Sequence, residues 1–480
     1  MPLPDTPLID IGDLTLSTGK GAKQEKLFHA VRGKVVSGLW PKGGKLPSTR
    51  ELAKALSLSR NTIIGAYEHL LAEGYIESRQ GSGYFVSVEL PEHYLLANKS
   101  TKDSATPLPM AAGDINRPFA PGIPDLAKFP YTKWQKLLQR HASRPSLLGN
   151  QSIQGSEALR SALSNYLATS RSVLCNPGRI IITAGAQQAL SIALMATMKK
   201  QDTVLMEHPG YIQARKIISL MGYGHQAVEV KEHSGLDIQQ VVASDAKALY
   251  VTPSNQYPMG TTLNTEDRLQ LIDWAVKGKR WIIEDDYDSE FQFAHRPYTS
   301  MQGLAGQMGW DNHVIYVGSF SKVMFNGLRL GYLVVPESLV PTCLMIKDAV
   351  TGDSPTHTQA ALADFISEGD LLRHIRKMRR LYKAKHQMVC ESVEQHFNGD
   401  IEVISQAAGL HVTLKWHTGI DENTWVARAN DAGITIRALN YYEQAKSGQR
   451  GWHSVVLGFG NIALDEINTK IKLLSRMFYQ

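Results

Sequence analysis

Six short apolar runs between residues 178 and 335 constrain the fold of this chain more than any other feature of its sequence. The runs are GRIIITAG, DTVLMEHPG, KALYVTPSN, RWIIEDDY, HVIYVGSF and LRLGYLVV, and helical patterns alternate with them. Apolar runs in this arrangement are typical of strands buried on both faces of a parallel sheet. We therefore predict that residues 119–480 form a large α/β domain with a mainly parallel sheet.

Polar residues or glycines stand at the end of each run. Ligands of open α/β sheets bind at the carboxyl ends of the strands, so these residues are the candidates for a site. Gly185, Ala186 and Gln187 stand at a predicted helix N-terminus, where free amides and the helix dipole suit a phosphate. In chain order the candidates are Gly185, Ala186, Gln187, Tyr211, Asn255, Asp285, Tyr287, Ser319, Ser321, Lys322 and Arg329.

Together these residues supply an anion cradle, a flat ring, an amide, a carboxylate, a phenol, a lysine and an arginine. Pyridoxal 5′-phosphate needs all of them, because it has a phosphate, a pyridine nitrogen, a phenolic oxygen and an aldehyde that condenses with a lysine. Each residue alone also has an ordinary structural explanation, such as a helix cap for Asp285 or a turn for Asn255. The prediction of this cofactor therefore depends on the ordered combination.

A basic module precedes the large domain. Residues 24–88 contain nine Lys or Arg and five Asp or Glu, so they carry +4 of the chain's net charge of +6. Three helical segments are expected there; Ser48 and Glu51 form a capping box at the second, and the third begins near Arg60. YIESRQGSGYFVSV then predicts a hairpin around a Gly-Ser-Gly turn. We predict a winged helix-turn-helix over residues 20–88.

In a winged helix-turn-helix the third helix enters the major groove of double-stranded DNA, with its N-terminal residues facing the bases. The positively charged and hydrogen-bonding side chains at these positions suit base edges and phosphates, and glycines let the wing approach the DNA backbone. The alternative is a small packing module with an incidental basic surface. The residues expected to contact DNA are Arg50, Arg60, Asn61, Thr62, Arg79, Gly81 and Gly83.

Between the two modules, residues 89–118 lose periodicity and gather Pro, Ser, Thr and Lys, which predicts either a linker or an ordered arm. No apolar run approaches the roughly 20 residues that span a bilayer. The chain starts without a basic signal-peptide region. The cysteines Cys175, Cys343 and Cys390 are far apart, which favours a reducing cytoplasm and neither a disulfide framework nor a metal site.

Residues 24–88 resemble the GntR type of winged helix-turn-helix, most clearly in PSTRELAKALSLSRNTIIGAYEHLLAEGYIESRQGSGYFV. Residues 119–480 resemble the fold-type I aminotransferases, in FAPGIPDLAKFP, IQGSEALRSAL, ITAGAQQAL, HPGY, PSNQYPMG, EDDYDSEF and GSFSKVMFNGLRLG. The whole chain resembles the MocR/GabR-type transcription regulators, which join these two parts. The resemblance implies a homodimer that binds operator DNA and senses a small molecule through pyridoxal phosphate.

The same resemblance implies a role for each candidate. Lys322 would form the internal aldimine, and Asp285, or its neighbour Asp286, would pair with the pyridine nitrogen. Asn255 and Tyr287 would contact the phenolic oxygen. Tyr211 would stack on the ring, and the phosphate would be held by Gly185, Ala186, Gln187, Ser319 and Arg329.

Two positions depart from the family pattern. Asn326 stands where many relatives have a proline, and Val456 aligns with the arginine that binds a carboxylate in amino-acid aminotransferases and in the γ-aminobutyrate regulator. Arg215 and Arg437 are the candidates to replace that arginine. The effector therefore remains open among pyridoxal phosphate itself, an amine and an amino acid. Two other functions also remain open, namely an active aminotransferase with an accessory DNA-binding domain and a regulator that has lost its cofactor.

Overall fold

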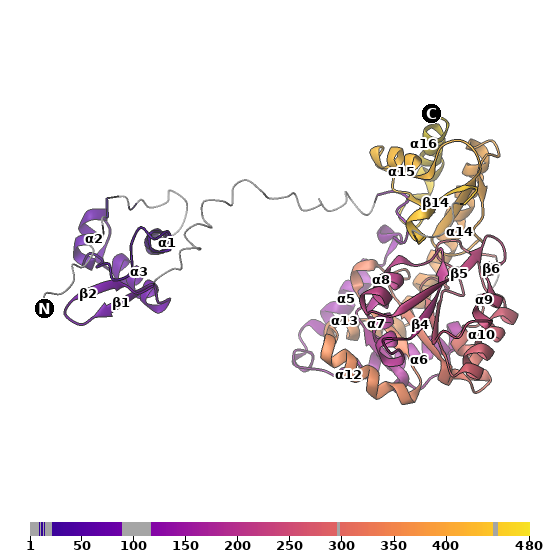
Figure 1. Cartoon of the computed structure of the whole chain (residues 1–480), viewed down its shortest axis with the longest axis horizontal. Coiled ribbons are helices and arrows are strands. Elements are labelled where there is room, and N and C mark those ends of the chain that lie inside the picture. The colour runs from indigo at the N-terminus through magenta and orange to yellow at the C-terminus, as the bar shows by residue number, and fades with distance from the viewer. Residues whose placement is uncertain are drawn as a thin grey trace. The chain divides into compact units, whose positions relative to one another are not determined.

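The computed structural model describes residues 22–88, 117–294, 298–444 and 450–480, together with residues 9, 11, 12 and 14. The chain divides into two compact units, residues 1–113 and 114–480 (Figure 1). Almost all of the predicted 89–118 connection lies outside the described residues. Within the described part of the chain, no helix is long and apolar enough to cross a membrane.

The small unit is a winged helix-turn-helix, as predicted. The capping box is present at its second helix, because the Ser48 hydroxyl accepts from the Glu51 amide at 3.2 Å and the Glu51 carboxylate accepts from the Ser48 amide at 2.9 Å. Ser59 caps the third helix by accepting from the Thr62 amide at 3.1 Å. The elements are α1 (Lys23–Val36), α2 (Thr49–Leu56), α3 (Arg60–Ala72) and the antiparallel hairpin β1 (Ile76–Arg79) and β2 (Gly83–Val86).

An eight-stranded sheet forms the centre of the large unit, with the order β3-β10-β9-β8-β7-β4-β5-β6. Adjacent strands from β9 to β5 are parallel, whereas β10 and β6 run antiparallel to their neighbours. All six predicted runs are strands, so the mainly parallel α/β fold is confirmed. The sheet consists of β3 (Ile180–Thr183), β4 (Thr203–His208), β5 (Gly224–Lys231), β6 (Gly235–Leu236), β7 (Ala248–Val251), β8 (Trp281–Asp286), β9 (Val314–Ser319) and β10 (Gly331–Val334).

The apolar-run analysis does not predict β5 and β6. Strand β5 lies near the sheet edge, and exposed or partly exposed residues make up most of it. It therefore lacks the continuous apolar run that marks the central strands.

Helices cover both faces of this sheet. One face packs against α7 (Ala186–Thr197), α8 (Ile212–Leu220) and α12 (Val340–Val350). The other packs against α6 (Glu157–Arg171), α10 (Thr265–Gly278) and α11 (Met301–Gln307). In β8, Ile283 lies on the α7 side and Ile282 lies on the opposite side. Because side chains alternate along a strand, the next residues of β8 also point to opposite faces.

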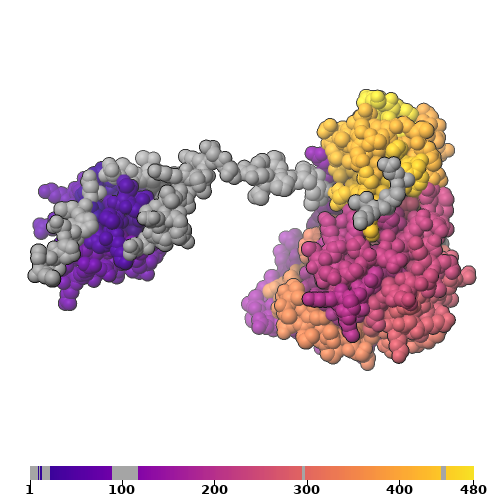
Figure 2. Space-filling model, viewed as in Figure 1, coloured from indigo at the N-terminus to yellow at the C-terminus, as the bar shows by residue number. Residues whose placement is uncertain are grey.

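The helices that precede the C-terminal lobe of the large unit also include α5 (Tyr131–Ala142), α9 (Ile238–Val242), α13 (Thr356–Ser367) and α14 (Asp370–His396). A C-terminal lobe follows α14 and lies at one end of the large unit (Figure 2). It contains an antiparallel sheet of order β11-β12-β14-β13. The lobe contacts the loop after β7 directly, because His411 Nε2 lies 3.2 Å from the Pro258 carbonyl oxygen. Its elements are β11 (Glu402–Val403), β12 (His411–Trp416), α15 (Glu422–Asp431), β13 (Arg437–Ala438), β14 (His453–Gly458) and α16 (Ile467–Tyr479).

Candidate functional site

A cavity of about 270 Å³ opens where β4, β7, β8 and β9 of the large unit end. This is the edge at which the sequence predicts the site. Two predicted residues, Gly185 and Asn255, do not line it. The predicted residues in the wall are Ala186, Gln187, Tyr211, Asp285, Tyr287, Ser319, Ser321, Lys322 and Arg329.

One end of the cavity is built to hold an anion. Helix α7 begins there at Ala186, and the amides of a first helical turn have no partner within the helix. The Ser319 hydroxyl donates to the Ser321 hydroxyl at 2.9 Å, and both line the cavity. The Arg329 guanidinium lies beside them and donates to the Ala184 carbonyl at 3.0 Å. Amides, hydroxyls and a guanidinium around one space suit a phosphate.

Gly185 directly precedes the helix α7 that contributes to this anion cradle. It precedes α7 with φ of +94°, a conformation that favours glycine. A Cβ added there would lie 3.5 Å from the Arg329 guanidinium. That distance is an ordinary van der Waals contact, so the backbone turn explains the glycine, which does not line the cavity.

Lys322 supplies a primary amine to the cavity from the turn after β9. Its Nζ donates to the Gly122 carbonyl, in the FAPGIPD stretch before α5. Burial lowers the pKa of Lys322 to about 8, although the nearby carboxylates Asp288 and Asp285 partly oppose the shift. Gly122 has φ of +82°, and a Cβ there would lie 2.9 Å from Nζ. The amine is therefore held in place and is more easily deprotonated than a solvated lysine.

The structure separates the two adjacent aspartates at the end of β8. Asp285 faces the cavity on the α7 side and accepts from the Tyr250 hydroxyl at 2.7 Å. Its Oδ1 is buried and has no hydrogen-bond partner within the described part of the chain. Burial raises the pKa of Asp285 to about 6, against the effect of the Tyr250 hydrogen bond. Asp286 points to the opposite face, where Arg171 Nε lies 2.6 Å from its Oδ2.

Asn255 stands behind the cavity wall because another residue binds its amide. Its Nδ2 donates to both oxygens of Asp288, at 3.1 and 3.0 Å. Gly409 packs closely against this pair. A Cβ at residue 409 would clash with both side chains, because it would lie 2.1 Å from Asn255 Nδ2 and 2.4 Å from Asp288 Oδ2. Tyr287 does line the cavity, and its hydroxyl donates to the Asn255 carbonyl at 2.8 Å.

Several wall residues are not predicted from the sequence. Tyr250 lies inside an apolar run, and His411 comes from β12, so neither follows a strand end of the large sheet. Asp288 could have been predicted from the sequence, because it belongs to the same EDDYDSEF stretch as Asp285. The wall residues without a predicted role are Pro121, Gly122, Tyr250, Thr252, Tyr257, Asp288, Asn326, Leu410 and His411.

The arginines proposed to replace a carboxylate-binding residue do not reach the cavity. Val456 is fully buried in β14, and Arg437 is its partner across the strand pair. The Arg437 guanidinium lies 4.9 Å from the centre of the Tyr441 ring, and Arg215 donates to the Glu443 carbonyl at 2.9 Å. Among the described residues, the cavity is lined by two cations, Lys322 and Arg329.

In the small unit, the predicted DNA-contacting residues gather at three places. Arg60 and Asn61 are exposed at the start of α3, and Arg50 is exposed in the first turn of α2. The Thr62 hydroxyl lies 2.8 Å from the Ser59 hydroxyl, so it also belongs to the cap of α3. In the wing, Arg79 forms an ion pair with Glu77 at 2.6 Å, and Gly81 and Gly83 have φ of +73° and +106°.

Known families match both units. Residues 23–86 match the gntR family of bacterial regulatory proteins, and residues 119–450 match the aminotransferase class I and II family. Fold and site thus define a class: a DNA-binding regulator that carries an aminotransferase-like domain. The chain belongs to the GntR-family regulators of the MocR type, in which these two domains are joined.

Two curated relatives match over almost their full length. The probable rhizopine catabolism regulatory protein MocR of Rhizobium meliloti is 34% identical over 91% of this chain and 90% of its own. The pyridoxine biosynthesis transcriptional regulator PdxR of Corynebacterium glutamicum is 29% identical over 91% of each chain. Among solved structures, the α-aminoadipate aminotransferase LysN of Thermus thermophilus covers 76% of this chain and 92% of its own, with a TM-score of 0.69 and 23% identity.

Proposed function

We propose that the large unit binds pyridoxal 5′-phosphate in the cavity and that ligand chemistry there controls operator binding by the small unit. The observation that carries the proposal is the juxtaposition, in a chain with a GntR-type domain, of Lys322, a buried carboxylate and an anion cradle. The bound cofactor would supply an aldehyde that condenses with primary amines and a ring that withdraws electrons.

The residues present fit this cofactor. The first turn of α7, with Ser319 and Arg329, would hold the phosphate. The Asp285 carboxylate would accept a hydrogen bond from the protonated pyridine nitrogen, because its buried Oδ1 has no other partner among the described residues. Tyr211 offers a ring beside the cavity, and Lys322 offers the amine.

The pKa of Lys322 predicts the pH dependence of cofactor capture. Only the neutral amine attacks an aldehyde, and a pKa of about 8 makes the amine mainly neutral above that pH. We expect the rate constant for capture to rise about tenfold per pH unit below pH 8 and to level off above it. The measurement is stopped-flow absorbance after mixing cofactor-free protein with pyridoxal phosphate. A rate constant that still rises tenfold per pH unit near pH 10 would mean that the pKa of Lys322 is not lowered.

For the effector, the charges in the cavity favour a ligand without a carboxylate. Arg329 would be engaged by the phosphate and Lys322 by the aldehyde, so no third cation among the lining residues would remain. Pyridoxal phosphate itself or an amine therefore suits the cavity better than an amino acid. The name of PdxR, which connects that relative with pyridoxine biosynthesis, agrees with pyridoxal phosphate as the effector. We place the protein in the cytoplasm as a homodimer.

The experiment compares operator binding with and without ligand. Fluorescence anisotropy of the DNA upstream of the protein's own gene would be measured with cofactor-free protein, with protein loaded with pyridoxal phosphate, and after adding an amine. Coupling requires that the ligand favour one state of the protein, so affinity must change with loading. Equal affinity in all three states would overturn the regulatory proposal. Turnover of an amino donor with a keto acid would instead support the alternative, an active aminotransferase.

A further inference from the structure

We infer that Arg171 is a positioning residue, which holds two parts of the cavity wall in register from the far side of the sheet. The inference rests on the proposed cofactor site. Arg171 is the last residue of α6 and is 2% exposed. It lies on the face of β8 opposite the cavity, so it does not line the cavity.

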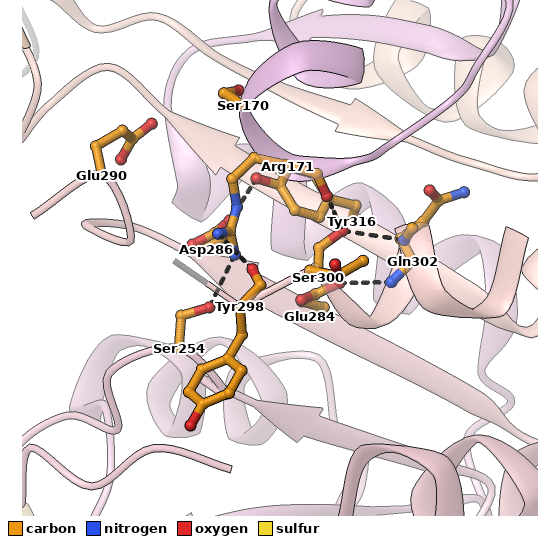
Figure 3. A network of polar contacts seen from close by, with 12 residues as sticks. Ser170, Arg171, Ser254, Glu284, Asp286, Glu290, Tyr298, Ser300, Gln302 and Tyr316 are labelled. Atoms are coloured by element: carbon orange, nitrogen blue, oxygen red, sulfur yellow. Dashed lines mark hydrogen bonds and ion pairs between the residues drawn. The ribbon is translucent and has the colours of Figure 1, made fainter. Parts of the chain in front are cut away.

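One guanidinium joins three separate segments (Figure 3). Nε of Arg171 donates to Asp286 Oδ2 at 2.6 Å, at the end of β8. A second nitrogen donates to the Ser254 hydroxyl at 2.8 Å, in the loop after β7. The third donates to the Tyr298 carbonyl at 3.0 Å. The Arg171 carbonyl also accepts from the Ser300 hydroxyl at 3.0 Å, so the arginine is fixed from both ends.

Two of the three anchors are sequence neighbours of residues that form or support the cavity wall, since Asp285 lines the cavity and Asn255 bonds to the wall residues Asp288 and Tyr287. Asp286 follows Asp285, and Ser254 precedes Asn255. Since neighbours in a strand point to opposite sides, fixing Asp286 in β8 also fixes the direction of Asp285. At Ser254 the hydrogen bond holds the turn after β7 in place. Arg171 therefore acts on Asp285 and on the loop that carries Asn255 through the backbone, without touching either side chain.

The two faces of β8 have matching support. Tyr250 of β7 donates to Asp285 at 2.7 Å, and Tyr316 of β9 donates to Asp286 at 2.5 Å. Asp286 Oδ2 thus accepts from both a tyrosine and an arginine, whereas Asp285 Oδ2 accepts from a tyrosine alone. The second oxygen of each aspartate is buried without a hydrogen-bond partner within the described residues, and that of Asp285 is on the cavity side. Arg171 and Tyr316 together hold Asp286 on the face of β8 away from the cavity. A planar guanidinium with several fixed donors suits this task better than an ammonium group.

A purely structural role for Arg171 is the competing explanation, and Arg268 provides the matched control. Arg268 is 1% exposed and comes from α10 on the same side of the sheet. It bonds the same two loops at 2.8 Å each, through the Pro253 and Thr299 carbonyls. Its third hydrogen bond goes to Leu263, so Asp286 takes no part in it. Loss of Arg268 therefore weakens the loops without releasing Asp286.

The test compares Arg171→Met with Arg268→Met in the full-length protein. Three quantities would be measured: the melting temperature, the Kd for pyridoxal phosphate by absorbance titration, and the pH midpoint of the bound cofactor's absorbance. Both variants should melt at lower temperature. Only Arg171→Met should weaken cofactor binding about tenfold and move the midpoint, because only it frees the end of β8. Equal cofactor affinity in the two variants, or an unmoved midpoint in Arg171→Met, would overturn the inference.

Milder variants decide the question if Arg171→Met does not fold. Arg171→Lys keeps the positive charge but loses the planar guanidinium with its several donors, and Ser254→Ala removes the hydrogen bond between Ser254 and Arg171. We expect each to lower cofactor affinity by a smaller factor, with Arg171→Lys nearer to the unchanged protein than Arg171→Met. Wild-type affinity and an unmoved midpoint in both would also overturn the inference. Failure of the unchanged protein to bind pyridoxal phosphate would instead contradict the proposed function.

Discussion

Replacement of Lys322 by alanine will abolish the absorbance band of covalently bound pyridoxal phosphate and the response of operator binding to ligand. Lys322 is the one lysine that lines the cavity among the described residues, so no other amine in the wall can take its place. We expect the covalent signal to fall to background. Operator affinity in the absence of cofactor should not change, because residue 322 belongs to the unit that does not contain the winged helix.

This result will not come from unfolding. Burial holds the pKa of Lys322 near 8, below its ordinary value of 10.5, so the native state binds its proton less tightly than the unfolded state. Folding around the protonated amine is therefore unfavourable at neutral pH, and its removal should leave the melting temperature of the cofactor-free protein equal or higher.

Lys347 provides the matched control for Lys322. It is fully buried in α12, and burial likewise lowers its pKa to about 8. Its Nζ donates to the Ile153 carbonyl and does not line the cavity. Lys347→Ala should therefore keep the covalent band. A band that persists in Lys322→Ala, or that disappears equally in Lys347→Ala, would contradict the assignment.

Replacement of Arg60 by alanine will weaken specific operator binding by about 10- to 100-fold, which corresponds to about 1–3 kcal/mol. Arg60 is the first residue of α3 and is exposed, at the end of the helix that would meet the bases. A positive charge at a helix N-terminus opposes the helix dipole, so its loss should not destabilise the small unit. Fluorescence anisotropy at fixed salt concentration measures the effect.

Lys34→Ala separates specific contact from general charge. Lys34 lies in the last turn of α1, and its removal also lowers the charge of the small unit by one. Long-range attraction should change alike in both variants, whereas discrimination between operator and unrelated DNA should fall only in Arg60→Ala. Equal losses in the two variants would mean that α3 does not read the bases.

Much of this architecture can be predicted because its signals are local. Continuous apolar runs mark the central strands, and the Ser48–Glu51 capping box marks the start of α2. The polar residues after the runs indicate the site, because parallel strands bring their carboxyl ends to one edge. The half-exposed strand β5 and the wall residue His411 of β12 give no such signal.

Contacts between distant segments could not be predicted in the same way. The side chain of Asn255 binds Asp288, 33 residues away, and Arg171 binds Asp286, 115 residues away. Neither pairing has a spacing that a helix or a strand imposes. Arg215 and Arg437 also lie outside the cavity, because Arg215 donates to the Glu443 carbonyl and Arg437 lies over the Tyr441 ring.

The sequence by itself determined the winged helix, the mainly parallel sheet and the identity of Lys322 as the amine at a strand end, because these depend on periodicity and on order along the chain. Only the tertiary structure decided which of the adjacent residues Asp285 and Asp286 faces the cavity. Adjacent residues of a strand point to opposite faces, and the sequence does not say which face holds the cavity. The packing of α7 on one side and of Arg171 on the other gives Asp285 to the cavity and Asp286 to the core.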